Sequence, residues 1–445
     1  MMNNKKCLVV GNNCREATMA YSLMQNGCIV YAVLSHENPT ITSIVNRTGG
    51  KYIVGNQKDG LLVSRFAVEQ KIDIAIVSSD AILEAGVVDY LREASIPTFG
   101  ATKEGAKIEW SKIYARNLVN EVDSSFNPKH SVINSVDELE QGFDKFVGQE
   151  MVVKPDGLTG GKGVKVMGEH LKSVDEAFEY AKAILKDGGN VLLEEKIEGF
   201  EFTIMGITDG HKIVVAPVTY DYSYRFDGDE GPGTGGMGCF TLDTGLLPCL
   251  TQNELNVCQE LMQKILNELN KKGIIFNGVL NGGFFKLKDG SLRLMEFNAR
   301  FGDPEVMNVL AVLETPFIDL IEACINGNLS QEVCKFKREA SIVVYAVSKD
   351  YPSSTSKAQV EFSANIDEIQ NHGANIFFGS CIKSENGKYL SVGTSRLAAV
   401  VMAGNSLEDI RNKTYEIINK YIIGNLDWRN DIGSKDKLIE MGKYI

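Results

Sequence analysis

Two side chains with oxygen donors lie two positions apart in the segment LRLMEFNAR. If this segment is a β-strand, Glu296 and Asn298 point to the same face, because side chains alternate along a strand. A carboxylate and an amide oxygen are ligands that Mg²⁺ accepts, while phosphates and waters fill its other positions. The pair therefore indicates a magnesium site, and the alternative is a polar strand end that faces solvent.

Charged residues are concentrated in the turn that follows, ARFGDPE. Arg300 carries a planar guanidinium, which can hold a carboxylate or a phosphate through two parallel hydrogen bonds. Asp303 lies three residues further on, next to Pro304, in what we expect to be a rigid turn. This turn is a second candidate for contact with charged small molecules.

A glycine-rich segment with basic residues, VVKPDGLTGGKGVKV, spans Val152 to Val166. Its glycines, which let a backbone approach a ligand closely, are Gly157, Gly160, Gly161 and Gly163. Lys154 precedes the loop and Lys162 lies near its tip, so two cations can contact a polyanion from different sides. The segment indicates a phosphate-binding loop, and the alternative is a flexible hairpin with solvated lysines.

The elements that must position these residues begin with an alternation of apolar runs and amphipathic segments. The segment CLVVGNNCREATMAYSLMQNGCIVYAV predicts a strand, a turn at Gly11, a helix and a strand, and a similar alternation follows up to Thr102. We therefore expect a parallel α/β domain over residues 1–102. Its first turn can hold an anion at a helix N-terminus, although a tight turn also needs glycine without any ligand.

The middle of the chain predicts helices and hairpins around the candidate site. We expect one helix from Lys103 to about Asn120, which carries Lys112, and a capped helix with Ser173 or Asp175 near its start. A second glycine-rich loop, EGPGTGGMGCF, precedes a long helix over residues 252–271. The strand with Glu296 belongs to a hairpin that turns at Asp289-Gly290, and a small α+β part follows.

Composition and charge limit the classes of function. The chain has 445 residues and a formal net charge of −12, which argues against a general nucleic-acid or membrane surface and favours small-molecule chemistry. The nine cysteines show no paired CxxC spacing, so we expect buried thiols rather than disulfides or a zinc site. Without a signal-peptide pattern or a long apolar span, a cytoplasmic location is expected.

The order of these motifs resembles that of the ATP-grasp ligases. Lys112, the Lys154 strand, the glycine loop, the EEKIEG connection and the EFN strand follow one another as in that superfamily. The longer segments KPDGLTGGKGV, GPGTGGMG and EFNARFGDPE resemble the phosphoribosylamine–glycine ligases, the glycinamide ribonucleotide synthetases of purine synthesis. The resemblance extends along the chain as far as WRNDIG near its end.

The resemblance implies a fold of α/β and α+β parts. It implies an N-terminal parallel α/β domain over residues 1–102 and an ATP-grasp domain over residues 103–330. Within the latter, a mobile lid subdomain is expected over about residues 121–192. A small C-terminal α+β domain follows over residues 331–445, and the chain is expected to be a monomer or a homodimer.

The resemblance also implies roles for individual residues. The residues implied to bind ATP are Lys112, Lys154, Gly160, Gly161, Lys162, Gly163, Glu194, Glu195, Ile197 and Glu201. Within this set Lys112 and Lys154 hold the phosphates, and the glycine loop closes above them. The segment from Glu194 to Ile197 meets adenine through its backbone, and Glu201 meets the ribose. Glu296 and Asn298 hold Mg²⁺, with Mn²⁺ as an alternative, while Lys154, Arg300 and Asp303 are the catalytic candidates.

The reaction that the resemblance implies joins a carboxylate to an amine. Glycine attacks the γ-phosphate of ATP to form an acyl phosphate, and phosphoribosylamine then displaces phosphate to give an amide. One alternative is a paralogous ligase with another amine or amino acid. A second alternative is a nucleotide-binding regulatory protein without turnover.

Departures from the family pattern are concentrated around the expected amine site. Asn13 and Cys14 stand where a glycine pair is usual, SHENPT replaces a Pro-Gly-Asn stretch, and SSDAIL, residues 78–83, replaces a Gly-Pro-Glu turn. Tyr222 and Ser223 replace His and Lys, and Gly233 replaces an asparagine. We therefore expect retained phosphoryl chemistry with an altered acceptor pocket.

Overall fold

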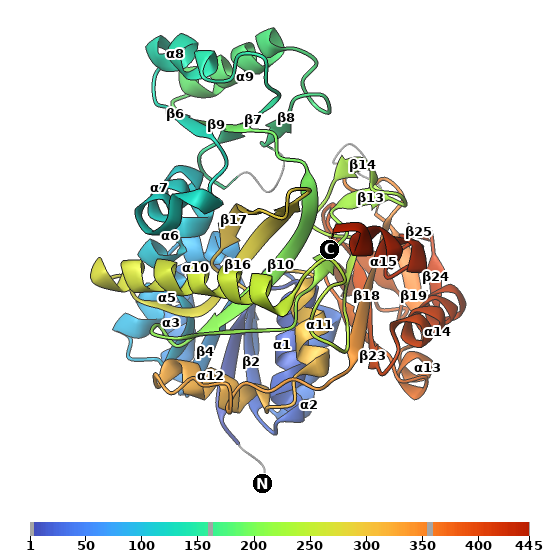
Figure 1. The fold of residues 1–445 in the computed structure, drawn as a ribbon. Helices are drawn as coiled ribbons and strands as arrows, with labels where there is room; N and C mark the ends of the chain where they lie inside the picture. The colour runs from blue at the N-terminus through green and yellow to red at the C-terminus, as the bar shows by residue number, and fades with distance from the viewer. Residues whose placement is uncertain (1–3, 159–162, 354–358, 445) are drawn as a thin grey trace.

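A parallel sheet forms the N-terminal part of the computed structural model, which describes residues 4–158, 163–353 and 359–444 (Figure 1). Its strands are β1 (Lys6–Val10), β2 (Ile29–Leu34), β3 (Tyr52–Val54), β4 (Ile74–Val77) and β5 (Thr98–Ala101), in the order β5-β4-β1-β2-β3. The helices between them are α1 (Cys14–Gln25), α2 (Pro39–Thr48), α3 (Gly60–Gln70), α4 (Asp80–Glu84) and α5 (Val87–Glu93). The central strands are apolar runs buried on both faces, as parallel sheets require, which confirms the predicted α/β architecture.

This sheet continues into the middle of the chain. The added strands are β10 (Gly199–Thr208), β11 (Ile213–Val215), β16 (Phe276–Leu287) and β17 (Leu292–Asn298). Strand β16 joins the two halves, because Phe276 and Asn277 pair antiparallel with Ala101 and Gly100 of β5. The strand that carries Glu296 is therefore hydrogen-bonded, through β16, to the N-terminal sheet.

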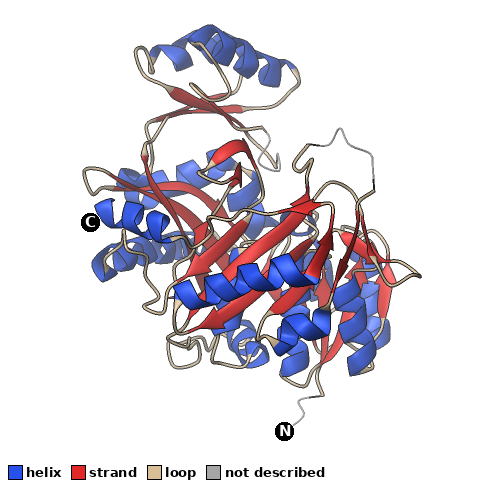
Figure 2. Cartoon of the chain, turned by 90° about the vertical axis from the view of Figure 1, so that its right-hand side faces the viewer, coloured by secondary structure: helices blue, strands red, loops and turns tan. Residues whose placement is uncertain are grey.

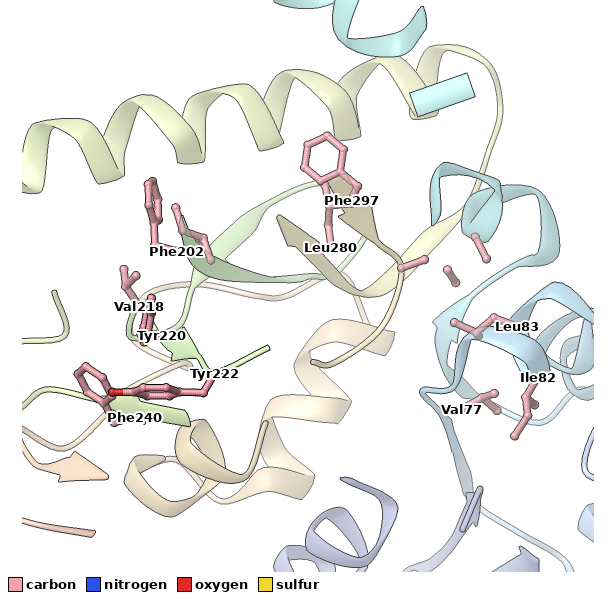
Figure 3. Close-up of a cluster of buried hydrophobic side chains, with 14 of the residues drawn as sticks. Val77, Ile82, Leu83, Phe202, Val218, Tyr220, Tyr222, Phe240, Leu280 and Phe297 are labelled. Carbon is pink, nitrogen blue, oxygen red and sulfur yellow. The ribbon is translucent and has the colours of Figure 1, made fainter. Parts of the chain in front are cut away.

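One face of β10, β16 and β17 is covered by the long helix α10 (Gln252–Lys271), whose bounds match the prediction. Figure 3 shows Phe202, Leu280 and Phe297 on the side of the sheet that faces this helix. Because side chains alternate along a strand, the other face carries the polar residues described below. The sheet thus separates an apolar core from the candidate site.

The expected helix from Lys103 to Asn120 is two helices, α6 (Lys103–Trp110) and α7 (Lys112–Asp123). The helix breaks at Ser111, whose backbone is extended and whose hydroxyl accepts a hydrogen bond from Tyr114 N at 3.2 Å. Serine favours such N-cap positions because its oxygen satisfies a backbone N–H that the first turn leaves free. As a result, Lys112 begins a new helix instead of lying inside a longer one.

A small sheet with two helices projects from the rest of the chain (Figures 1 and 2). Its strands are β6 (His130–Ile133), β7 (Met151–Pro155), β8 (Lys165–Val166) and β9 (Val191–Glu195), in the order β6-β9-β7-β8, with the short turn η2 (Val136–Glu138) and helices α8 (Leu139–Asp144) and α9 (Val174–Lys186). Ser173 caps α9, as expected. These elements share a hydrophobic cluster of their own, which includes Ile133, Phe146 and Leu193.

The C-terminal part contains two sheets. The first has the order β12-β15-β18-β23-β20, with β25 paired to β18, and its strands are β12 (Tyr220–Asp221), β15 (Gly238–Thr241), β18 (Ala340–Ser348), β20 (Asn375–Phe378), β23 (Ala398–Gly404) and β25 (Leu426–Asp427). The second consists of β21 (Cys381–Lys383), β22 (Tyr389–Ser391), β19 (Glu361–Ala364) and β24 (Ile422–Gly424). Strands β12 and β15 come from the middle of the chain, so the C-terminal sheet is built from two distant segments.

The remaining elements link these layers. They are the hairpin β13 (Tyr224–Phe226) and β14 (Glu230–Gly233), helices α11 (Glu305–Val312), α12 (Phe317–Ile325), α13 (Ile366–Asn371), α14 (Leu407–Tyr421) and α15 (Lys435–Met441), and the short turns η1 (Ser124–Phe126) and η3 (Gly442–Tyr444). All nine cysteines are buried free thiols, as expected. Among the described residues, no helix combines the length and apolarity needed to cross a membrane.

Candidate active site

Two adjoining cavities lie against the polar face of β10 and β17. The larger has a volume of about 1310 Å³ and the smaller about 390 Å³. Residues that line both include Glu109, Lys112, Glu201, Ser223, Glu296 and Arg396. These residues come from helices, strands and loops far apart in the sequence, so the cavities form only when the whole chain is folded.

The two predicted phosphate lysines both line the larger cavity. Lys112 begins α7, and its Nζ donates to Gly157 O at 2.9 Å, which ties it to the first glycine loop. Burial and the positive charge of Lys154 lower the pKa of Lys112, although Glu296 opposes the shift. Lys154 lies on β7, and its Nζ is 2.6 Å from Glu194 Oε2.

The glycine loop connects β7 to β8, as predicted. Val152 pairs with Val166 and closes an antiparallel hairpin. Gly157 has a φ of +115°, which favours glycine, and Gly163 O accepts a hydrogen bond from Tyr180 OH at 2.8 Å. The loop-tip residues Gly160, Gly161 and Lys162 lie outside the described residues.

Glu194 lies between two cations. Its carboxylate contacts Lys154 and also Arg116, whose Nε is 2.5 Å from Glu194 Oε1. Burial alone would raise the pKa of Glu194, but Arg116 and Lys154 lower it to about 2. The predicted adenine contacts Glu195 and Ile197 follow on the same segment, and neither lines either cavity as the structure describes them.

A row of polar residues runs across β10, β16 and β17. Thr203 pairs with Gly283, which pairs with Glu296, while Asn281 pairs with Asn298. Paired residues in antiparallel strands share a face, so these side chains and Glu201 point to the same side. Burial and the charge of nearby carboxylates, Glu296 first among them, raise the pKa of Glu201 to about 7.

The donors around the predicted metal pair suit a hard cation. Glu296 Oε1 is 3.3 Å from Asn298 Nδ2, and Asn298 Oδ1 accepts from Arg300 Nη2 at 3.1 Å. The neighbouring Asn281 is buried, lines the smaller cavity and has an Oδ1 atom without a hydrogen-bond partner. Among the described residues, no cluster of three His, Cys, Asp or Glu could hold a metal alone, whereas Mg²⁺ needs only one or two carboxylates plus phosphates. These oxygen donors therefore fit Mg²⁺.

Arg300 and Asp303 are held by partners that sequence analysis did not predict. Arg300 Nε is 3.1 Å from Glu109 Oε1, and the other oxygen of Glu109 accepts from Ala299 N at 2.8 Å. Asp303 is 3.1 Å from Arg396 Nη2 and also accepts a hydrogen bond from Tyr345 OH. Both predicted residues line the smaller cavity, and the C-terminal part of the chain supplies the partners of Asp303.

Arg396 also binds the second glycine loop. Its Nη1 donates to Asp303 O at 2.8 Å, to Gly236 O at 3.0 Å and to Gly235 O. Arg396 thereby joins the loop that begins at Glu230 to the turn that follows β17. The position of Arg396 resembles a family position near the active cleft, but its partners, which lie 93 or more residues away in the chain, could not be predicted from the sequence.

The altered turns lie at the carboxyl ends of the neighbouring strands β1, β2 and β4. Ligands of open α/β sheets bind at this edge. Asn13 and Asp80 line the smaller cavity, but the thiol of Cys14 points away and contacts Phe377 O at 3.1 Å. Burial acts to raise the pKa of Asp80, but the positive charges of Arg300 and Arg15 contribute to a larger opposing effect, so the pKa lies below its usual value.

Of the other departures from the family pattern, one is buried in the core and two line the cavities. Tyr222 is buried, and its hydroxyl donates to Asp431 O at 3.2 Å and accepts from Gly433 N at 2.9 Å. Ser223 lines both cavities and Gly233 lines the larger one. Tyr222 thus serves packing, whereas the other two positions shape the candidate site.

Solved structures with this fold include nucleotide complexes. The biotin carboxylase domain of the Hydrogenobacter thermophilus 2-oxoglutarate carboxylase, solved with MgADP and bicarbonate, matches with a TM-score of 0.70 and 15% identity over 95% of this chain and 91% of that chain. Phosphoribosylamine–glycine ligase from Thermotoga maritima matches with a TM-score of 0.79 and 24% identity over 96% and 100% of the two chains. At these identities, the matches show the fold alone.

The fold and the cavity between lysine-bearing and carboxylate-bearing strands define an ATP-grasp protein. Family models for the N domain, the ATP-grasp (A) domain and the C domain of phosphoribosylglycinamide synthetase match residues 5–109, 110–306 and 341–435. The chain belongs to this phosphoribosylamine–glycine ligase family. Relatives of that name are 37% identical in Pyrococcus furiosus (97% of this chain, 95% of the relative) and in Methanococcus vannielii (98% of each).

Proposed function

We propose that this enzyme joins glycine to 5-phosphoribosylamine at the expense of ATP, and releases glycinamide ribonucleotide, ADP and phosphate in purine synthesis. The observation that carries the proposal is one cavity whose lining includes Lys112, Lys154 and Glu296. Full-length relatives that are named for this reaction support the choice of substrates.

In the first step, the glycine carboxylate attacks the γ-phosphorus of ATP, and the bond to the β-phosphate oxygen breaks. Lys112 and Lys154 bind the phosphates and offset negative charge as it moves toward ADP. Glu296 and Asn298 would hold Mg²⁺, or Mn²⁺ in its place, and the ion supplies further neutralisation of phosphate charge. No nucleophile from the protein is needed.

In the second step, the amine attacks the carbonyl carbon of glycyl phosphate and phosphate leaves. Arg300 and Asp303 position the carboxylate and amine substrates, because both line the smaller cavity where Asn13 and Asp80 also lie. Closure of the projecting lid would exclude water, which otherwise hydrolyses the acyl phosphate. We assign the lid to about residues 121–192, within an ATP-grasp domain over residues 103–330.

The remaining contacts with ATP complete the proposal. The backbone from Glu194 to Ile197, which includes Glu195, would meet adenine, and Glu201 would meet the ribose hydroxyls. The loop from Gly160 to Gly163 would cover the phosphates. The enzyme would act in the cytoplasm as a monomer or homodimer, with small molecules as its substrates.

The test measures ADP release by the purified protein with ATP, Mg²⁺ and glycine, with and without phosphoribosylamine generated in situ. Mass spectrometry identifies the product. We expect glycinamide ribonucleotide only when both substrates are present. Turnover with a different amine or amino acid would replace these substrates and identify a paralogue, and ATP binding without any amide product would indicate a regulatory protein.

A further inference from the structure

The guanidinium of Arg116 connects three separate elements beside the candidate site. Arg116 is 3% exposed and lies one turn after Lys112 on α7, so both side chains share a face of the helix. Its Nε bonds to Glu194 on β9, while Nη1 and Nη2 donate to the carbonyls of Leu294 and Met295 on β17, at 2.9 and 2.7 Å. Most of its N–H donors are thus committed to protein groups.

On one side, Arg116 shares Glu194 with Lys154. The two cations contact different oxygens of one carboxylate, at 2.5 and 2.6 Å, and Glu194 is 3% exposed. Because Arg116 offsets part of the negative charge, Lys154 is not the sole partner of Glu194, and its side chain, which lines the larger cavity, is attracted less strongly to the carboxylate. Without Arg116, the full attraction of a buried carboxylate would fall on Lys154.

On the other side, Arg116 binds an irregularity in β17. Glu296 pairs with Gly283 and Leu294 pairs with Phe284, so Met295 is an extra residue in the strand. Such a bulge leaves backbone groups without ladder partners and changes where the following side chains point. Because of the bulge, Leu294 is buried in the core while Glu296, two residues later, lines the cavity. Arg116 donates hydrogen bonds to the carbonyls of Leu294 and Met295 at the bulge.

We propose that Arg116 is a positioning residue that sets both the availability of Lys154, through Glu194, and the orientation of Glu296, through the bulge at Met295. The inference rests on the proposed ligase function, which it deepens. Arginine suits both tasks because its planar fork presents several donors in fixed directions, whereas a lysine offers one compact charge.

The test compares Arg116→Lys and Arg116→Met with the unmodified enzyme. MgADP binding is measured by calorimetry, and the Mg²⁺ concentration for half-maximal turnover is measured kinetically. Arg116→Lys keeps the charge beside Glu194 but cannot span both carbonyls, so MgADP affinity should change little while the Mg²⁺ requirement rises about tenfold. Arg116→Met should weaken MgADP binding roughly tenfold, the size of coupling between contacting charges.

A double variant distinguishes positioning from a general loss of structure. In the double variant Arg116→Met with Glu194→Gln, the carboxylate that attracts Lys154 away from the bound phosphates is replaced by a neutral amide. MgADP affinity should therefore recover toward that of the unmodified enzyme. Because Glu194→Gln also removes the buried charge that Arg116→Met leaves without its arginine, the melting temperature of each variant is measured beside binding, and recovery counts only if the single variant is folded at the assay temperature. Lys286→Met is the matched control. Lys286 is also buried, its Nζ is 2.7 Å from Glu254 Oε1, and neither residue lines either cavity. It should lower the melting temperature and leave both readouts unchanged.

Three results would overturn the inference: unchanged readouts in Arg116→Met, equal effects in Lys286→Met, or no recovery in the double variant. Failure of the proposed function has a different signature, since the unmodified protein would then bind MgADP but make no amide. Calorimetry of MgADP binding tests the effect of Arg116 on Lys154 whether or not the enzyme forms an amide.

Discussion

At the scale of single residues, the candidate site depends on charges that are buried but paired. Glu194 pairs with Arg116 and with the catalytic candidate Lys154, and Glu109 pairs with the candidate Arg300. Asp303 is held between Arg396 and Tyr345. Removing one partner of such a pair leaves an uncompensated buried charge, which is strongly destabilising. The exposed Glu296 is different, because its carboxylate faces the cavity and is free to meet a ligand.

Replacing Glu296 with alanine should separate catalysis from binding. If Glu296 holds the metal that offsets charge in the transition state, kcat falls by about 100-fold or more, whereas ATP affinity falls less than about tenfold. Steady-state kinetics and calorimetry measure the two quantities. Glu260→Ala, at an exposed position of α10, is the control. Equal losses of turnover and affinity would count against the catalytic role.

Glu201 predicts a pH-dependent stability. Because the folded state raises its pKa to about 7, the folded chain binds more protons than the unfolded chain between the ordinary carboxyl pKa and pH 7. Ionisation of buried Glu201 therefore does not lower the free energy of unfolding in acid, but lowers it by its full amount above pH 7. Glu201→Gln should raise the melting temperature at about pH 8 but not at about pH 4, and should weaken ATP binding. A melting temperature that does not rise at alkaline pH would contradict the shift.

At the scale of elements, breaks in regular structure place the functional groups. The interruption at Ser111 puts Lys112 at a helix start, and the bulge at Met295 turns Glu296 toward the cavity. Ser111 Oγ also donates to Asp156 Oδ2 at 3.0 Å, which links the helix start to the glycine loop. Local irregularity therefore has a positional role in both walls of the site.

Ser111→Ala should affect stability and ATP binding together. Loss of an N-cap costs about 1 kcal/mol, which urea denaturation measures. Because the cap also fixes Lys112, KM for ATP should rise. Ser406→Ala removes the cap of α14, whose residues line neither cavity, and should cost similar stability without changing KM. A KM effect of equal size in both variants would show that the break does not position Lys112.

At the scale of the whole molecule, the sheets cross the boundaries suggested by the sequence. Strand β16 extends the N-terminal sheet, and β15 pairs with β18 in the C-terminal sheet. The projecting sheet of β6 to β9 has a core of its own, and its two connections meet where Glu195 N donates to Lys129 O at 2.9 Å. The shared sheets and the separate core of the projecting sheet predict which parts of the chain can be deleted without loss of folding.

Two deletions test this arrangement. A chain that ends at residue 330 should fail to fold, because β15 would lose its partner and the core it covers would be exposed. A chain in which a short Gly-Ser linker replaces residues 130–194 should remain folded but inactive, since the removed part has a separate core. Circular dichroism and thermal melting distinguish the two. A folded truncation at residue 330 would show that the C-terminal sheet is independent.

The sequence by itself determined the fold class, the helix over residues 252–271 and the hairpin around Lys154, because hydrophobic periodicity, capping residues and glycine spacing act over short distances. The family followed from the resemblance of the segments KPDGLTGGKGV, GPGTGGMG and EFNARFGDPE to known ligases. The sequence also identified Lys112, Lys154, Glu296 and Arg300 as candidates, and all four line the cavities.

Only the tertiary structure decided which groups surround those candidates. Glu109, Arg116 and Asn281 carry no distinctive local motif, and their partners lie up to 191 residues away in the chain. Their roles arise from burial, since a charge removed from water must find a partner wherever the fold brings one within reach. The same holds for the joined sheets, because strand pairing depends on which edges meet in space and not on the order of the segments.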